Sequence, residues 1–229
     1  TVDPIYTFGG QLPSTQPFTA HPKVDSRTGN MLAFGYEAEG FGSDVVSFFE
    51  IDKTTSKKLW ETKIKVPYVG MIHDYGITDH YVMVYCVPLT IDHEQMRRGG
   101  IHWSWDRNGK TWFGVFRRGG DGKDLRWFEG PTRSGTHTMG VFEDGNKLYF
   151  DTESTAGNPF PFMPNKDGSP PDFKGAESYL HRITVDLSGK AKVYNIEKIF
   201  PLSMPLPRQD DRYNTVPYRY GYGACPDPS

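Results

Sequence analysis

Three histidines of this 229-residue chain share one local pattern. His21, His73 and His137 each precede a tight polar turn, and a run of strand-forming residues follows each turn. Equivalent positions in repeated hairpins converge on one axis, so the three imidazoles are expected to meet. Imidazoles without paired cysteines suit zinc, copper, iron or nickel, whereas calcium and magnesium prefer oxygen ligands. The pattern therefore predicts a transition-metal site that is assembled by the whole fold.

Ligand imidazoles usually give their second N–H to a carboxylate or a carbonyl. Asp25, Asp74 and Glu143 lie near the three turns and are the candidates for this role, with capping of their own backbone as the alternative. The remaining histidines lack the shared pattern and are predicted to be surface or structural residues: His80, His93, His102 and His181.

Strand-like segments recur along the whole chain between turns rich in Gly and Pro, which total 25 and 18. Several segments alternate polar with apolar residues, so the pattern predicts an all-β fold. Helix is expected only at 91–98, as one or two turns. The predicted strands are 31–36, 45–51, 58–64, 71–78, 81–87, 112–117, 138–142, 147–151, 179–186 and 192–199.

The charge balance argues against a polyanionic partner. Lys and Arg total 26 against 28 Asp and Glu, a net charge of −2, so nucleic acid binding is not expected. No apolar run reaches the roughly 18 residues of a membrane-spanning helix, and residues 1–13 lack the pattern of a signal peptide. We therefore expect no integral membrane segment and a cytoplasmic location.

The cysteines and tryptophans are predicted to be structural. Cys86 and Cys225 are too few for a disulfide scaffold, and Cys86 lies in an apolar run where a free buried thiol is expected. Trp103, Trp105 and Trp112 also allow a carbohydrate-binding interpretation, but core packing between strands is the more common role.

A long connection at 153–178 is rich in Pro and Gly yet carries large apolar side chains. Loops of this length in compact folds often serve function. Two interpretations are about equal: the side chains line an apolar substrate tunnel, or they only pin the loop to the fold. The residues concerned are Phe160, Phe162, Met163 and Phe173.

Segments around the histidines carry a resemblance to a known family. They are 18–25 with 34–36, 71–78, 113–118 with 126–128, His137 with Phe142-Glu143, and 217–222. In sequence and in order these segments resemble the carotenoid cleavage oxygenases, and most closely the lignostilbene dioxygenases of bacteria and fungi. The resemblance extends over nearly the whole chain.

The resemblance implies a seven-bladed β-propeller with non-haem Fe(II) on its axis, held by four histidines from different blades. His21, His73 and His137 match the first three ligands, and the fourth is expected beyond Ser229. At roughly 40–50 residues per blade, 1–229 form about four to five blades. We therefore expect one incomplete β-propeller domain, a middle portion of the family protein. One of the glutamates that the family places behind its ligand histidines lacks a match at 205–208. The tyrosine and lysine that engage the substrate's phenol in the stilbene-cleaving subgroup are expected upstream of the chain.

The function implied by the resemblance is that of a dioxygenase, which uses O2 to cleave a carbon–carbon double bond of a lignostilbene-like stilbenoid into two aldehydes. The partners are then O2 and an apolar or phenolic alkene. Residues 137–140 resemble the stilbene-cleaving branch more than the carotenoid-cleaving one. Cleavage of a carotenoid or apocarotenoid, an isomerase reaction on the same iron, and an iron-free propeller that serves as a binding scaffold remain alternatives.

Overall fold

Three antiparallel sheets of four strands make up most of the computed structural model, which describes residues 6–158, 160–171 and 175–225. The first sheet contains β1 (Lys23–Val24), β2 (Met31–Gly35), β3 (Val45–Ile51) and β4 (Lys58–Lys65). The second contains β5 (Tyr75–Ile77), β6 (Tyr81–Cys86), β9 (Thr111–Arg117) and β10 (Arg126–Gly130). The third contains β11 (Thr138–Asp144), β12 (Lys147–Ser154), β13 (Tyr179–Asp186) and β14 (Asn195–Ser203). Each sheet is therefore an up-and-down meander.

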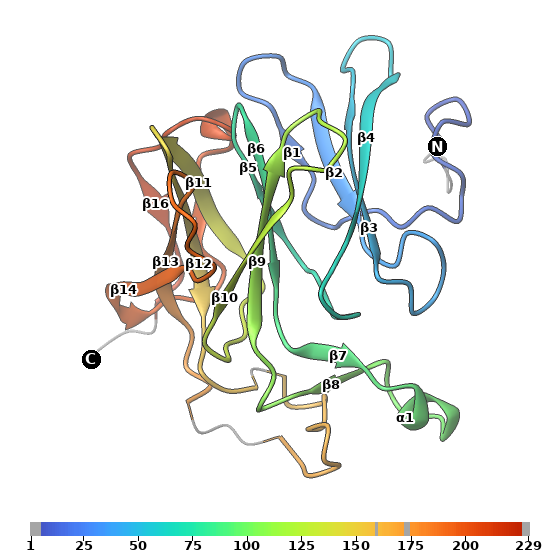
Figure 1. The fold of residues 1–229 in the computed structure, drawn as a ribbon, viewed down its shortest axis with the longest axis vertical. Helices are drawn as coiled ribbons and strands as arrows, with labels where there is room; N and C mark the ends of the chain where they lie inside the picture. The colour runs from blue at the N-terminus through green and yellow to red at the C-terminus, as the bar shows by residue number, and fades with distance from the viewer. Residues whose placement is uncertain (1–5, 159, 172–174, 226–229) are drawn as a thin grey trace.

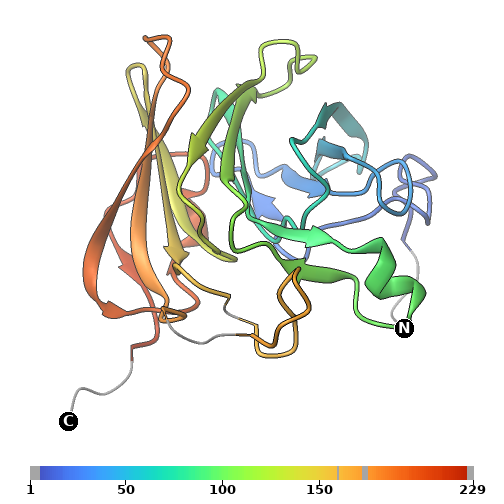
Figure 2. The same ribbon diagram turned by 60° about the horizontal axis from the view of Figure 1, so that its bottom comes forward.

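The sheets follow one another in space in the order of the chain, from blue through green to orange (Figure 1). After a turn of 60°, the third sheet is seen on one side of the second sheet and the first sheet on the other side (Figure 2). A small hairpin of β7 (Leu89–Ile91) and β8 (Trp103–Trp105) carries α1 (His93–Arg97). Near the end of the chain, β15 (Arg208–Gln209) pairs with β16 (Gly221–Tyr222), and a 3-10 helix spans Asp211–Tyr213. Among the described residues, no helix has both the length and the apolar composition needed to cross a membrane.

The second sheet is buried on both faces, and the alternation along β6 shows why. Val82 and Val84 face the first sheet, where they join a cluster with Phe34 and Phe48. Because successive side chains of a strand point to opposite faces, Met83 and Tyr85 join a second cluster, shared with the third sheet. Apolar packing on both faces thus fixes the sheets against each other.

Trp103 and Trp105 are buried in the cluster that the second and third sheets share, and Trp112 packs partly buried against the other. The core-packing interpretation of the tryptophans is therefore confirmed. Cys86 is a buried free thiol, also as predicted.

The predicted strands overlap observed ones throughout, and α1 lies within the predicted 91–98. The prediction of a strand over 71–78 was wrong for its first half, since β5 begins only at Tyr75. Before that point Met71 N bonds to Leu89 O, and the Asp74 side chain accepts the backbone N–H of Tyr75. The chain therefore passes the β7 hairpin before it enters the sheet. The prediction missed β10 and the short strands β1, β7, β8, β15 and β16.

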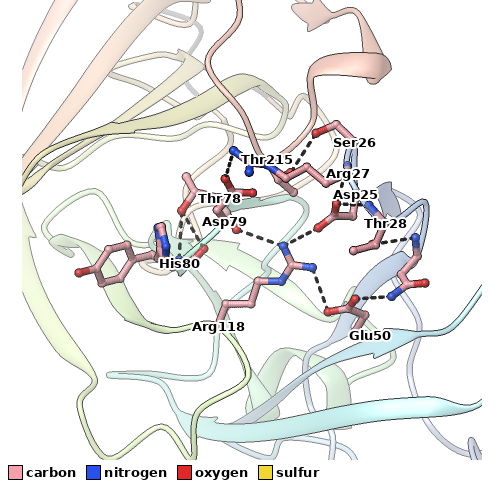
Figure 3. A network of polar contacts seen from close by, with 12 residues as sticks. Asp25, Ser26, Arg27, Thr28, Glu50, Thr78, Asp79, His80, Arg118 and Thr215 are labelled. Atoms are coloured by element: carbon pink, nitrogen blue, oxygen red, sulfur yellow. Dashed lines mark hydrogen bonds and ion pairs between the residues drawn. The ribbon is translucent and has the colours of Figure 1, made fainter.

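A buried ion-pair network joins the first two sheets (Figure 3). Arg118 directly follows β9, and its guanidinium lies 2.6 Å from Asp25 Oδ2 and 3.0 Å from Glu50 Oε2. Asp25 also accepts backbone N–H groups of Arg27 and Thr28 at 2.8 and 2.9 Å. Burial alone would raise the pKa of Asp25. The hydrogen bonds that its carboxylate accepts from these groups and from Arg118 outweigh this effect and hold the pKa below its usual value. The pairing offsets the cost of burying these charges.

Candidate metal centre

Each of the three histidines lies directly before the first strand of its sheet. His21 precedes β1 by two residues, His73 precedes β5 by two, and His137 immediately precedes β11. The first strands of the three sheets lie close together, since β5 contacts β11, and Lys23 of β1 pairs with Asp74, which directly precedes β5. The shared pattern seen in the sequence is thus the entry into a four-stranded meander, and its repetition brings the imidazoles together.

The imidazoles face one another through their Nε2 atoms. His21 Nε2 lies 2.9 Å from His73 Nε2, which lies 3.3 Å from His137 Nε2. Nitrogen ligands of a single ion at about 2.1 Å are spaced by about 3.0 to 3.4 Å in octahedral or tetrahedral geometry. Among the described residues, no cysteine or carboxylate belongs to the group. The donor set therefore fits a transition-metal ion with positions left for further ligands.

Burial keeps the imidazoles of His21 and His73 in the uncharged form that binds metal. Burial lowers the pKa of His73, and the neighbouring His21 and His137 lower it further. Burial also lowers the pKa of His21, although Asp74 opposes this effect. Near neutral pH both rings are therefore uncharged, and each has a nitrogen lone pair available for a metal.

Glu153 orients the third imidazole. Its Oε1 lies 2.8 Å from His137 Nδ1, and Thr136 Oγ1 also donates to this oxygen. Burial alone would raise the pKa of Glu153, but the hydrogen bonds from His137 and Thr136 hold it below its ordinary value. The ionised carboxylate can only accept, so Nδ1 of His137 carries the proton and Nε2 presents its lone pair to the other histidines.

The expectation that Asp25, Asp74 or Glu143 holds one of the three imidazoles was wrong. Asp25 pairs with Arg118, and Glu143 Oε1 lies 2.8 Å from Nδ1 of the exposed His80. Asp74 binds Lys23 and the backbone N–H of Thr138. These carboxylates flank the turns, as the sequence indicated, but their side chains face other partners.

The sequence interpretation missed Glu153. Pairing outward from the turn at Gly145 is shifted by a bulge between Thr138 and Gly140, so Thr138 lies opposite Thr152 and position 153 lies beside His137. The predicted strand ended at residue 151, whereas β12 continues for three more residues to Ser154 and so includes Glu153. Leu206, in the segment without a matching carboxylate, donates its backbone N–H to Glu153 Oε2 at 3.1 Å.

The other histidines lie outside the group, as predicted. His102 Nε2 lies 3.3 Å from Glu37 Oε1, and His181 Nδ1 lies 2.9 Å from the carbonyl oxygen of Tyr179. These contacts are those of structural residues.

A pocket of about 330 Å³ opens beside His21 and His137, and Lys23, Met139 and Arg208 contribute to its wall. Phe160, Phe162 and Met163, which were predicted to line a substrate tunnel, are not part of this wall. Met163 is buried in the cluster between the second and third sheets, and Phe160 packs against that cluster. Phe162 is 65% exposed. Phe173 lies outside the described residues, and the tunnel role of all four stays a prediction.

The comparisons with known proteins agree with this arrangement. Residues 1–229 match the family model described as Retinal pigment epithelial membrane protein. Lignostilbene-alpha,beta-dioxygenase isozyme III of Sphingomonas paucimobilis is 40% identical over 225 residues, which are 96% of this chain and 46% of the relative. Resveratrol cleavage oxygenase 1 of Aspergillus fumigatus is 35% identical over 98% of this chain and 45% of its own length.

The crystal structure of Pseudomonas brassicacearum lignostilbene dioxygenase superposes with a TM-score of 0.91 at 38% identity. The match covers 97% of this chain and 46% of that chain, so the chain spans about half the length of the relatives it matches. The family match over the whole chain and the identity to these oxygenases agree with the resemblance that the histidine segments carry. The chain therefore belongs to the carotenoid cleavage oxygenase family.

Proposed function

We propose that the protein to which this chain belongs is a non-haem Fe(II) dioxygenase that cleaves the carbon–carbon double bond of a stilbenoid into two aldehydes. The observation that carries the proposal is the convergence of three Nε2 atoms within 4.8 Å, in a chain 40% identical to a lignostilbene dioxygenase. The resveratrol-cleaving relative supports the same substrate class, a phenolic alkene.

The proposal includes the architecture around the site. The three four-stranded meanders correspond to three consecutive blades of a β-propeller, and further blades complete the ring in the longer protein. This is fewer than the four to five blades expected from the chain length, because long connections such as 87–110 and 155–178 add residues without adding a four-stranded sheet. Each blade that carries a ligand presents it just before its first strand. A fourth histidine from the part of the protein beyond Ser229 completes the ligand set.

His21, His73 and His137 hold the iron. Bound Fe(II) supplies a centre that reduces dioxygen beside an alkene, since an all-imidazole ligand set leaves its charge unbalanced and positions open. Glu153 keeps the proton of His137 on Nδ1, and burial keeps His21 and His73 uncharged. Each alkene carbon receives one oxygen atom of O2 as the double bond breaks, so the products balance without an added reductant.

The test uses the full-length protein, purified without oxygen, loaded with Fe(II) and mixed with a hydroxystilbene under ¹⁸O₂. We expect two aldehydes, each with one labelled oxygen, and one O2 consumed per alkene. His73→Ala should abolish the products, while His181→Ala, a histidine outside the centre, should leave them. Absence of any aldehyde from hydroxystilbenes contradicts the stilbenoid proposal.

The same assay separates the alternatives. If an apocarotenoid yields aldehydes and no hydroxystilbene does, the protein belongs to the carotenoid-cleaving branch. A rearranged product formed without O2 consumption indicates an isomerase. Failure to retain iron after anaerobic reconstitution, measured by elemental analysis, indicates a scaffold that binds its partner without metal.

A further inference from the structure

The carboxylate of Asp74 contacts all three sheets at the point where their first strands meet. Its Oδ1 lies 2.9 Å from Nζ of Lys23, in the first sheet, and accepts the backbone N–H of Tyr75, in the second, at 2.8 Å. Its Oδ2 accepts the backbone N–H of Thr138, in the third sheet, at 2.9 Å. The side chain is 5% exposed, so solvent screens these contacts little.

Every one of these contacts lies within two residues of a histidine of the candidate centre. Lys23 follows His21 by two positions, Asp74 follows His73, and Thr138 follows His137. A chain segment of one or two residues has few free torsions, so the point of contact also fixes the histidine backbone.

Two of the three histidine segments have little sheet structure to hold them. The pairing of β1 with β2 comprises only Lys23 with Leu32 and Val24 with Met31. The first strand of the second sheet, β5, has three residues, whereas β11 has seven. Ladder hydrogen bonds therefore fix His137 better than His21 or His73, and the two weaker segments need another anchor.

We propose that Asp74 is a positioning residue that ties the two short segments to β11, so that His21, His73 and His137 present their Nε2 atoms to one ion. The inference rests on the proposed metal function. A carboxylate suits the task because its two oxygens accept from several donors at once. Lys23 supports the link further, since its Nζ lies 5.1 Å from the centre of the Tyr75 ring.

Asp74→Asn is the informative change. Asparagine keeps one carbonyl oxygen but replaces the other with an NH2 group, which faces a second donor at Lys23 or at the Thr138 N–H. One of the two links is therefore lost, while side-chain volume is nearly unchanged.

The chain offers a matched control in Asp25. This carboxylate is likewise buried, and it also accepts two backbone N–H groups and one cation, here Arg118. None of its partners is adjacent to a histidine of the centre. Asp25→Asn therefore reproduces the loss of a buried, satisfied carboxylate without disturbing the proposed anchor.

Thermal unfolding, the Kd of Co(II) and the visible absorption spectrum of bound Co(II) are measured for the full-length wild type and both variants. We expect both variants to lower the unfolding temperature. Only Asp74→Asn should weaken Co(II) binding, by about 10-fold or more, and shift the Co(II) absorption bands. Asp25→Asn should leave Kd within about two-fold of the wild type, because in the described part of the chain its partners Arg27, Thr28 and Arg118 form no hydrogen bond or ion pair with the proposed anchor or the three histidines of the centre.

Equal Kd values and spectra for the wild type and Asp74→Asn overturn the positioning role while leaving the metal centre intact. A wild type that binds no Co(II) overturns the proposed metal function and the positioning role with it. If Asp74→Asn does not fold, Lys23→Met decides, since methionine keeps an apolar stem over Tyr75 but cannot bond to Asp74. Weaker Co(II) binding by Lys23→Met supports the anchor, and unchanged binding overturns it.

Discussion

Glu153 and His137 are separated by 16 positions and lie at the ends of neighbouring strands, yet Oε1 of one lies 2.8 Å from Nδ1 of the other. The contact assigns the ring proton to Nδ1 and leaves Nε2 free to bind a metal. One hairpin thus supplies both a proposed metal ligand and the group that orients it.

Glu153→Gln should weaken the binding of Fe(II) or Co(II) by about 10- to 100-fold, because the ring of His137 loses its charged acceptor. Titration calorimetry under anaerobic conditions measures the change. Glu143→Gln is the control, since Glu143 pairs with the exposed His80 instead. Equal affinities for the two variants would argue that Glu153 does not orient the ligand.

His73→Ala should remove bound metal altogether, because His73 Nε2 is the atom that lies within 2.9 and 3.3 Å of the two other Nε2 atoms. Metal content is measured by elemental analysis after reconstitution and gel filtration. His80→Ala should retain the wild-type content, since His80 is outside the group. Stoichiometric metal in His73→Ala would contradict the assignment of this ligand.

Acid should destabilise the metal-free protein from about pH 6.5 downward. The pKa values of His21, His73 and His181 are lowered from 6.5, mainly by burial. The unfolded chain therefore binds more protons on acidification, so this contribution is complete above pH 6.5 and is lost as pH falls toward the lowered values. Urea unfolding between pH 8 and 5.5 measures the trend.

The variant His181→Asn should reduce this pH dependence without touching the candidate centre. A wild-type stability that stays constant over that interval would show that the buried imidazoles do not titrate as the geometry requires.

Arg118→Met should destabilise the fold by about 3–5 kcal/mol, because it leaves Asp25 and Glu50 buried without their cation. Urea unfolding gives the value. Arg27→Met removes an exposed pair with Asp79 and should cost less than about 1 kcal/mol. Similar losses for the two variants would mean that the buried pairs of Arg118 with Asp25 and Glu50, drawn in Figure 3, contribute little.

The parts of the site that the sequence predicted are those marked by a pattern of neighbouring residues. His21, His73 and His137 could be grouped because each stands before a turn and a strand that the sequence makes visible. Most strands of the three sheets were visible for the same reason, through alternation along each segment and the turn residues between them, whereas β1 and β10 were not predicted.

The partners of these residues depend on register and packing, which a local pattern does not contain. Glu153 reaches His137 through a pairing that includes a bulge between Thr138 and Gly140. Asp74 looked like one more turn-adjacent carboxylate, and only the meeting of three sheets gives it Lys23 and Thr138 as partners. A sequence shows where a carboxylate occurs but not which way it faces.

The meander topology also places the long connections and the short turns at opposite ends of the sheets. Strand direction alternates, so the connections 36–44, 87–110 and 155–178 all leave their sheets at the end where the histidines lie. The turns that directly follow the first strands, 25–30, 78–80 and 145–146, lie at the opposite end and are short. Insertions over the histidine end can therefore reshape what reaches the centre, while the opposite end keeps the strands in register.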